Sequence, residues 1–241
     1  MRSRALNDAL RGFRASIPFW LGFIPLGFIL GAQASRQGMS AVTAGLMAFF
    51  NYAGGSEFAA VALWSAAPPV LLIALTTWLI NSRHIVLGAA LSIYTRRQSF
   101  LENAFLFFLM CDEVWAVSMN EIRRRRAEGA SDDEAFSYAF HVGAGFGFWI
   151  PWALTTASGA YFGNALGDLD RFGFAMAFPA TFITLIVLMW PGWKRSAPIA
   201  ASAAAAAAAS LWLPSWATVL AGTAAGLAAA VWGPHAGEEG A

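Results

Sequence analysis

Apolar residues in this chain gather in long stretches that short polar connections separate. The stretches run over Ser16–Ala34, Ala41–Leu63, Pro68–Ile93, Ala104–Met119, His141–Phe162, Phe172–Trp190, Ile199–Leu213 and Ala217–Trp232. Most approach the roughly 20 residues that an α-helix needs to cross the ~30 Å hydrocarbon core of a membrane. The pattern predicts an all-α polytopic transmembrane helical bundle, a single domain over residues 1–241, with about six to eight spans.

The second stretch is interrupted over Asn51–Phe58 (NYAGGSEF), where two adjacent glycines and Glu57 stand in an otherwise apolar run. Glycine weakens a helix, and freed backbone groups are tolerated at membrane depth only inside protein or beside a water-filled cavity. We interpret this stretch as a broken or re-entrant helix whose ends frame a binding site. A glycine kink that serves packing alone, with Glu57 at a helix interface, is the alternative.

The third stretch contains Asn81, Ser82, Arg83 and His84. Asn81 and His84 are three residues apart and therefore share a helix face. An arginine deep in the membrane costs at least ~2.5–3.5 kcal/mol on insertion scales, so Arg83 should face a carboxylate or an aqueous cavity. If the helix ends near Ser82, the Arg83 side chain can instead extend to the membrane surface.

Two adjacent carboxylates, Asp112 and Glu113, stand near the middle of the fourth stretch. Two buried acids cannot both stay ionised without partners. An ion pair with Arg83 is the simplest interpretation, and a role in proton transfer is the alternative.

Orientation follows from the arginines and lysines, because basic flanks tend to stay in the cytoplasm. Basic clusters before the first stretch, at Arg123–Arg126 and at Lys194–Arg195 predict a cytoplasmic amino terminus and a cytoplasmic loop over residues 121–137. Arg96–Arg97 is the exception, since alternating spans would place this pair outside. Either the pair violates the bias, or the second or third stretch does not fully cross the membrane.

Weak internal similarity links the two halves of the chain. Phe19-Trp20 with glycines at 22, 27 and 31 resembles Phe148-Trp149 with glycines at 159, 163 and 167. Close helix packing also selects glycines at such spacings, so duplication and packing both remain explanations.

Composition supports a membrane protein and excludes several other classes. The chain is 58% hydrophobic and 12% charged, against about 25% charged residues in an average soluble domain. The net charge of +1 without a continuous basic face argues against a nucleic-acid partner. Cys111 is the only cysteine, which excludes an intrachain disulfide and a thiol metal cluster, and we expect it to pack between helices.

No motif of an enzyme or of a cofactor site occurs along the chain. A Gly-x-Ser-x-Gly elbow, a His-Glu-x-x-His zinc motif and a phosphate-binding loop are all missing from the sequence. His141 and His235 are expected to be an interfacial side chain and a tail residue. We therefore predict a non-enzyme without a metal or cofactor.

At these same residues the chain resembles the AzlC family, the large subunit of bacterial branched-chain amino acid exporters. The resemblance covers most of residues 17–121. Its strongest elements are Pro18, Gly22 and Pro25-x-Gly27 in the first stretch, the break at residues 53–58, the Asn81–His84 segment and the Asp112-Glu113 pair. The second half is similar in a weaker pattern of Trp149, Thr156, Gly159, Gly163 and Phe178–Phe182.

The resemblance implies secondary export of leucine, isoleucine, valine or related amino acids such as methionine. It also implies a small AzlD-like membrane partner and a multi-pass location in the bacterial inner membrane. This chain departs from the family pattern at Glu57, where family members usually have glutamine. The added carboxylate puts branched-chain specificity in doubt, because it can change the substrate or the coupling ion.

Our hypothesis is a substrate cavity in the membrane midplane. Broken-helix amides would bind the substrate carboxylate, and Glu57 or the Asp112-Glu113 pair would bind its ammonium, with transport driven by proton antiport or by the substrate gradient. The candidate site residues are Gly54, Gly55, Ser56, Glu57, Phe58, Asn81, Arg83, His84, Asp112 and Glu113. The alternatives are a non-transporting membrane scaffold, an intramembrane enzyme and a passive channel.

Overall fold

The computed structural model of the protein describes residues 2–163, 183, 192–193 and 196–232. All regular elements among these residues are helices, as predicted. Internal contacts divide the chain into two compact units, residues 1–178 and 179–241, and each is described by itself. The sixth predicted stretch, Phe172–Trp190, lies outside the described residues apart from Ile183, and so do Gly167 and His235.

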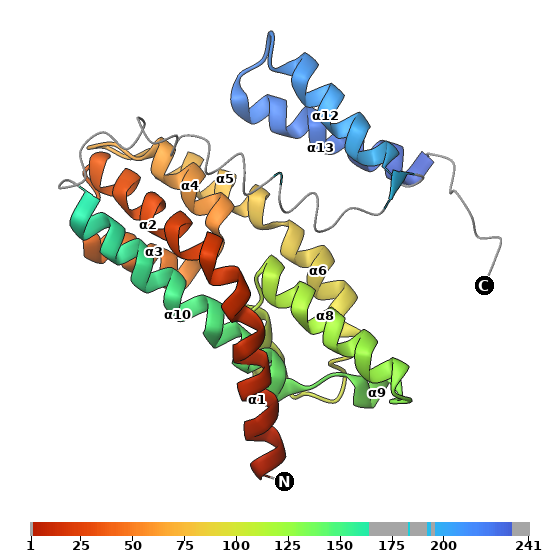
Figure 1. The fold of residues 1–241 in the computed structure, drawn as a ribbon. Coiled ribbons are helices and arrows are strands. Elements are labelled where there is room, and N and C mark those ends of the chain that lie inside the picture. The colour runs from red at the N-terminus through yellow and green to blue at the C-terminus, as the bar shows by residue number, and fades with distance from the viewer. Residues whose placement is uncertain (1, 164–182, 184–191, 194–195, 233–241) are drawn as a thin grey trace. The chain divides into compact units, whose positions relative to one another are not determined.

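Two long helical rods pack together in the first unit. Helix α1 (Arg2–Ser16), a 3-10 turn (Ile17–Phe19) and α2 (Trp20–Arg36) follow one another as the first rod, and α10 (Tyr138–Phe162) is the second. Figure 1 shows them side by side along their length, and their contacts make them the most extensive helix pair of this unit. The pair runs parallel, because α1 contacts the start of α10 whereas the far part of α2 contacts its end.

Glycines bring these two rods into backbone contact. A Cβ atom added at Gly31 would collide with the backbone of Thr156 and Ala160, and one at Gly159 would collide with the Phe28 carbonyl. Contacts of this kind let helix axes approach closely, as in other membrane helix pairs. Close packing therefore explains Gly31 and Gly159, whereas nothing lies within 4 Å of a Cβ added at Gly22.

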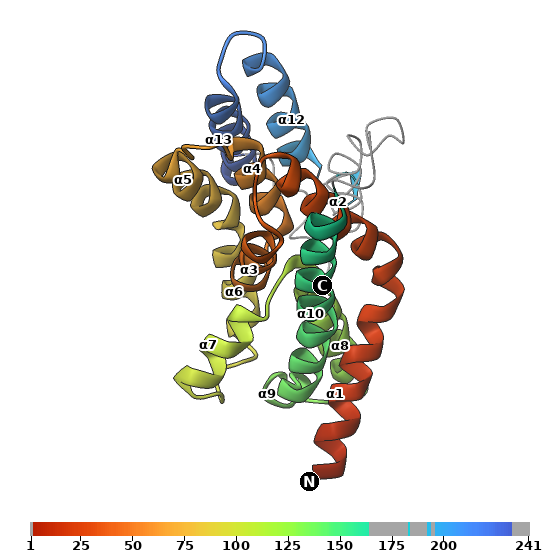
Figure 2. The ribbon, with the colours of Figure 1, turned by 90° about the vertical axis from the view of Figure 1, so that its left-hand side faces the viewer.

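The second predicted stretch forms a hairpin instead of a complete crossing. Helix α3 (Ala41–Asn51) runs antiparallel to α10, since Gly45 contacts Ala157 while the Phe49 carbonyl accepts a hydrogen bond from Trp149. The helix stops at Tyr52, whose φ of 46° lies in the left-handed region. Helix α4 (Gly54–Leu63) then returns toward the far end of α2 and the start of α5, as Figures 1 and 2 show. We call α3 and α4 the first hairpin.

The third predicted stretch is one kinked span. Helices α5 (Val70–Asn81) and α6 (Arg83–Ser92) meet at Ser82. Two helical segments, Val70–Ser92 and Arg4–Arg36, are long and apolar enough by composition to cross a membrane among the residues the structure describes. At 25 residues, α10 is also long enough, at about 37 Å.

The fourth predicted stretch forms a second hairpin that enters from the opposite end. Helix α7 (Phe100–Phe108) runs parallel to α10, because Phe105 stacks near Phe146 and Phe108 near Trp149. The helix is interrupted at residues 109–111. Helix α8 (Asp112–Ala127) then returns along α10 and is followed by the short α9 (Asp132–Ala135). Figure 2 shows α7 and α9 at the end of this unit that carries the amino terminus.

The first hairpin resolves the position of Arg96–Arg97. Because α3 and α4 return to the end from which they entered, the kinked span α5–α6 descends to the end where α1 begins. Arg97 accordingly lines the same cleft as Arg4, Arg11 and Arg125. Of the two explanations drawn from the sequence, incomplete crossing by the second stretch is the one the fold supports.

The second unit contains a helical hairpin over the last two predicted stretches. Helices α12 (Ala197–Ala209) and α13 (Ser215–Trp232) pack against each other. Gly222 lies against Ala206, and Gly226 lies against Ser202, so the two helices are antiparallel. The alanine-rich surface of α12 allows this close approach.

Candidate functional site

The tips of the two hairpins meet inside the first unit. The thiol of Cys111, at the tip of the second hairpin, donates a 3.4 Å hydrogen bond to the hydroxyl of Tyr52, at the tip of the first. Both side chains are buried. Cys111 was predicted to pack between helices, and it does so with an additional polar contact. Two breaks that are 59 residues apart in sequence are thus brought to one place.

Glu57 holds the tip of the first hairpin together. Its side chain is fully buried, and one carboxylate oxygen accepts a 2.9 Å hydrogen bond from the backbone N–H of Ala53. The other oxygen accepts a 2.7 Å bond from the indole N–H of Trp152 on α10. Gly54 permits this approach, since an added Cβ there would lie 3.1 Å from the Trp152 ring.

A chain of amide and hydroxyl groups joins this tip to the kink in the third span. The Asn51 amide donates to Ser56 Oγ at 2.9 Å and to Glu57 at 3.4 Å. The Asn81 amide in turn donates to Asn51 Oδ1 at 3.1 Å. The structure therefore connects three of the predicted site residues, Ser56, Glu57 and Asn81, in one hydrogen-bond network.

The predicted ion pair between Arg83 and the acidic pair is confirmed. Arg83 Nη1 lies 3.0 Å from Asp112 Oδ2, and the Asp112 side chain is only 9% exposed. Asp112 and Glu113 open α8, where carboxylates interact favourably with the helix dipole. Their position differs from the prediction, because they begin the returning arm of a hairpin and do not stand within a continuous span.

The other predicted site residues take supporting positions. Phe58 is buried in the apolar core of the first unit, and Gly55 is buried in the first turn of α4. His84 is half-buried, with Nδ1 at 3.1 Å from the Asn81 carbonyl, so it contacts its own helix kink. Among the described residues, no group of three or more His, Cys, Asp or Glu side chains is arranged to hold a metal.

Two polar atoms beside these networks have no partner in the described structure. Asn81 Oδ1, an acceptor, and Arg83 Nε, a donor, are both buried and make no hydrogen bond there. A buried polar group without a partner costs roughly 1–3 kcal/mol. The acceptor and the donor belong to residues on either side of Ser82, where α5 and α6 meet.

Sequence reasoning missed Trp152 and misjudged His141. Trp152 looked like an ordinary apolar residue of a span, and only the fold shows its indole N–H directed at Glu57. The expectation that His141 is interfacial is wrong, because its side chain is fully buried. Its ring nitrogens contact Ser118 Oγ at 2.9 Å and the Leu106 carbonyl at 3.1 Å, which ties both arms of the second hairpin to α10.

A separate charged cluster lies at the outer end of α8. Glu121 accepts hydrogen bonds from Arg11, Arg124 and Arg125, at distances of 2.8 to 2.9 Å. Partial burial alone would raise the pKa of Glu121, but the hydrogen bonds from the three arginines outweigh it and lower the pKa to about 2. The cluster joins α1 to α8 at the arginine-rich end of the unit.

Comparisons with known proteins show which family this chain is similar to. A sequence model described as AzlC protein matches residues 18–166, more than half of the chain. The inner membrane protein YgaZ of Escherichia coli is 28% identical over 158 residues, which cover 65% of this chain and 62% of that protein. The branched-chain amino acid transport protein AzlC of Bacillus subtilis is 27% identical over 187 residues, covering 76% of this chain and 68% of that protein.

An archaeal relative is similar to this chain at about the same level of sequence identity. A membrane protein of Archaeoglobus fulgidus is 29% identical over 180 residues, which cover 74% of each chain. No solved structure matches the chain significantly. The matches run through both hairpins and α10, so the candidate site lies within the region shared with this family.

Proposed function

Because the chain belongs to the AzlC family, we propose that it is the large subunit of a secondary transporter exporting branched-chain or related hydrophobic amino acids. The Bacillus subtilis relative, named a branched-chain amino acid transport protein, supports this substrate class. The proposed partner is a small AzlD-like membrane protein. The proposed location is the bacterial inner membrane, with the arginine-rich end in the cytoplasm.

The observation that carries this proposal is the meeting of two hairpin tips at Tyr52 and Cys111. Interrupted helices at membrane depth require protein or a water-filled cavity around their free backbone groups, and transporters use such breaks as binding sites. The two hairpins enter from opposite ends of the unit, and a substrate site at their tips would lie between them. Alternating opening of the two tips would then give access from one side at a time.

Substrate recognition in this proposal uses the groups that the fold leaves near the tips. The amino-terminal end of α4 begins at the first hairpin tip without a side-chain cap, and helix amino termini favour a carboxylate. Arg83 Nε supplies an additional donor to that carboxylate. Asn81 Oδ1 and the half-buried Glu113 accept from the substrate ammonium.

Glu57 has a more specific role than direct contact with the ammonium. Its two oxygens already accept from Ala53, Asn51 and Trp152. A glutamine amide, with one acceptor and one donor end, cannot accept all three of these hydrogen bonds. We therefore assign Glu57 to shaping the tip, through which it sets substrate preference.

Efflux of labelled leucine, isoleucine, valine and methionine from cells making both subunits tests the proposal. We expect saturable efflux of at least one amino acid, and a reduction of about tenfold or more in Arg83→Gln, equivalent to about 1.4 kcal/mol of lost binding. Glu57→Gln should change the order of preference among the four substrates. Asp132→Asn is the control, because that side chain is exposed at 55% and pairs with an exposed arginine.

Absence of flux, with both subunits verified in the membrane, would reject branched-chain export. Unchanged efflux in both Glu57→Gln and Arg83→Gln would reject the site but not the transporter. An imposed pH gradient separates the two energy sources, since only proton antiport accelerates efflux when the outside is made acidic.

A further inference from the structure

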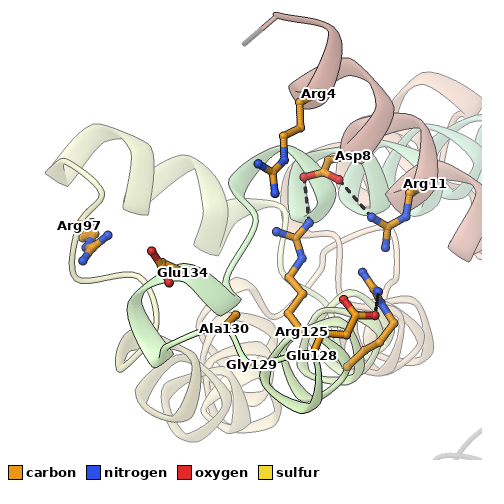
Figure 3. Close-up of a pocket in the computed structure, with 10 residues that line it drawn as sticks. Arg4, Asp8, Arg11, Arg97, Arg125, Glu128, Gly129, Ala130 and Glu134 are labelled. Atoms are coloured by element: carbon orange, nitrogen blue, oxygen red, sulfur yellow. Dashed lines mark hydrogen bonds and ion pairs between the residues drawn. The ribbon is translucent and has the colours of Figure 1, made fainter.

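The arginine-rich end of the first unit contains a cleft of about 790 Å³. It lies between α1, the turn before α7, the end of α8 and α9. Figure 3 shows side chains of α1 and α8 turned toward this shared space, with Arg97 on the opposite wall. Its lining contains five arginines (Arg4, Arg11, Arg97, Arg124 and Arg125) and three acids (Asp8, Glu128 and Glu134). We call it the basic cleft.

The charges of the basic cleft do not balance. The lining holds five arginines and three carboxylates, and Glu121 behind it pairs with Arg11, Arg124 and Arg125, so one positive charge remains in excess. Asp8 is shared between Arg11 at 3.1 Å and Arg125 at 2.8 Å. Arg4 has no ion pair or hydrogen bond within the described chain, and Figure 3 shows its guanidinium on the same side of the cleft as Asp8 and Arg125. An anion in this cleft would restore neutrality.

An apolar groove of about 550 Å³ adjoins the basic cleft. Both are lined by Arg11 and Arg124, so the two spaces adjoin at these side chains. The groove runs between α1 and α8. Its apolar lining residues are Ala15, Phe19, Ala116, Val117 and Phe140, and its polar ones, Arg11, Asn120, Glu121 and Arg124, include the two arginines shared with the cleft. A ligand that fills both spaces needs an anionic group joined to a hydrocarbon chain.

The length of the first rod places this cleft near the membrane surface. The helical segment Arg4–Arg36 contains 33 residues, which extend about 50 Å. The hydrocarbon core accounts for ~30 Å of this length, so the rod extends beyond it, and the arginines of its amino-terminal end favour the headgroup layer there. The same end exposes Leu6 at 61% and Leu10 at 44% beside its arginines, a combination typical of helices in a membrane interface.

We propose that the basic cleft and the adjoining groove hold one anionic phospholipid. Its phosphate lies against Arg4 and Arg97, beside the Asp8–Arg125 ion pair, and one acyl chain lies between α1 and α8. Basic pockets between membrane helices bind anionic headgroups by this combination of charge and apolar contact. This site is separate from the hairpin tips and carries its own test.

Native mass spectrometry of the purified full chain, equilibrated with phosphatidylglycerol and phosphatidylcholine, measures the binding. We expect preferential retention of phosphatidylglycerol, and about fivefold weaker retention in Arg4→Gln, from the ~1 kcal/mol that one arginine contributes near an anionic surface. Arg14→Gln is the matched control, because it removes an exposed arginine of the same helix outside the cleft. Equal losses in the two variants would overturn the site.

A second variant and a second probe distinguish a lipid from a free anion. Ala116→Trp fills the groove and should reduce phosphatidylglycerol retention while leaving the melting temperature of the lipid-free protein unchanged. Inorganic phosphate alone should stabilise the protein little. If phosphate raises the melting temperature as much as phosphatidylglycerol does and Ala116→Trp has no effect, the occupant is a free anion and the lipid assignment is wrong.

Discussion

The carboxylate of Glu57 stabilises the first hairpin tip from inside. Buried charge is tolerated in proteins where hydrogen bonds replace water, and here the donors come from the tip itself and from α10. Trp152 is the long-range contact, since it lies 95 residues from Glu57 in sequence. The tip is therefore fixed to the central rod by one indole N–H.

Replacing Trp152 by phenylalanine should destabilise the protein more than the same change at Trp149. Trp152→Phe loses a hydrogen bond to a carboxyl group, with an expected cost of about 2 kcal/mol, whereas Trp149→Phe loses one to the neutral Phe49 carbonyl, at about 1 kcal/mol. Both changes remove similar volume. Thermal unfolding in detergent measures the difference in stability between the two variants. Equal losses would show that the hydrogen bond to Glu57 contributes no more than the one to the Phe49 carbonyl.

At the scale of elements, the parallel rods depend on positions where no side chain fits. Gly12, Gly31, Gly143 and Gly159 each lie directly against the backbone of the partner rod. The contacts extend from α1 through α2, so the second rod is held along most of its length. Rod packing then positions Trp149 and Trp152 for the first hairpin and His141 for the second.

Gly159→Ala should separate the rods. Its added Cβ would collide with the Phe28 carbonyl, a backbone atom that cannot move aside without shifting the helix. We expect a loss of at least about 2 kcal/mol, within the usual range for overpacking. Gly22→Ala is the control, since nothing lies within 4 Å of its added Cβ. Yield of folded, monodisperse protein and its melting temperature provide the comparison.

The Glu121 cluster predicts a dependence of stability on pH. The pKa of Glu121 in the folded protein is about 2, below its ordinary value of 4.5. A carboxyl group with a lowered pKa stabilises the fold fully above its ordinary pKa, and this contribution disappears as the pH falls from about 4.5 toward 2. Melting temperatures of the wild type should fall through that window. The Glu121→Gln variant should have a lower melting temperature at neutral pH and lose less of it between pH 4.5 and 2. Parallel curves for the two proteins would show that Glu121 does not cause the pH dependence.

At the scale of the whole first unit, the two hairpins determine which connections share an end of the helix bundle. The first hairpin returns to its starting end, so the kinked span brings Arg96–Arg97 to the same end as α1. The second hairpin enters from that end and returns to it with Arg123–Arg126. All three basic clusters of the first unit's described part then agree with one orientation.

Cysteine labelling can test this arrangement in a Cys111→Ser background, in which the hydroxyl retains a donor for Tyr52. Cysteines introduced at Asn7 and Arg96 should react with a membrane-impermeant thiol reagent from the same side, and a cysteine at Gln37 from the opposite side. All three positions are exposed. Labelling of Arg96→Cys together with Gln37→Cys would mean that the second stretch crosses completely.

The sequence by itself determined that lipid surrounds the protein and where its helices break, and it gave an ion pair between Arg83 and the acidic pair as the simplest interpretation. Hydropathy reflects the free energy of transferring each residue into lipid, and adjacent glycines beside a carboxylate indicate where a helix is interrupted. Both are local properties of the sequence. The Arg83–Asp112 pair followed from the same reasoning, since two unlike buried charges need each other.

Only the tertiary structure decided whether the chain continues or returns after each break. A helix break does not show in which direction the chain goes on, because that depends on contacts with α10. The contact between Glu57 and Trp152 of α10 joins residues that are 95 positions apart in sequence. The same contacts selected Trp152 as the partner of Glu57 and buried His141, although neither differs in sequence from an ordinary residue of a span. Direction and partnership are properties of packing between distant segments, and hydropathy along one segment carries no information about them.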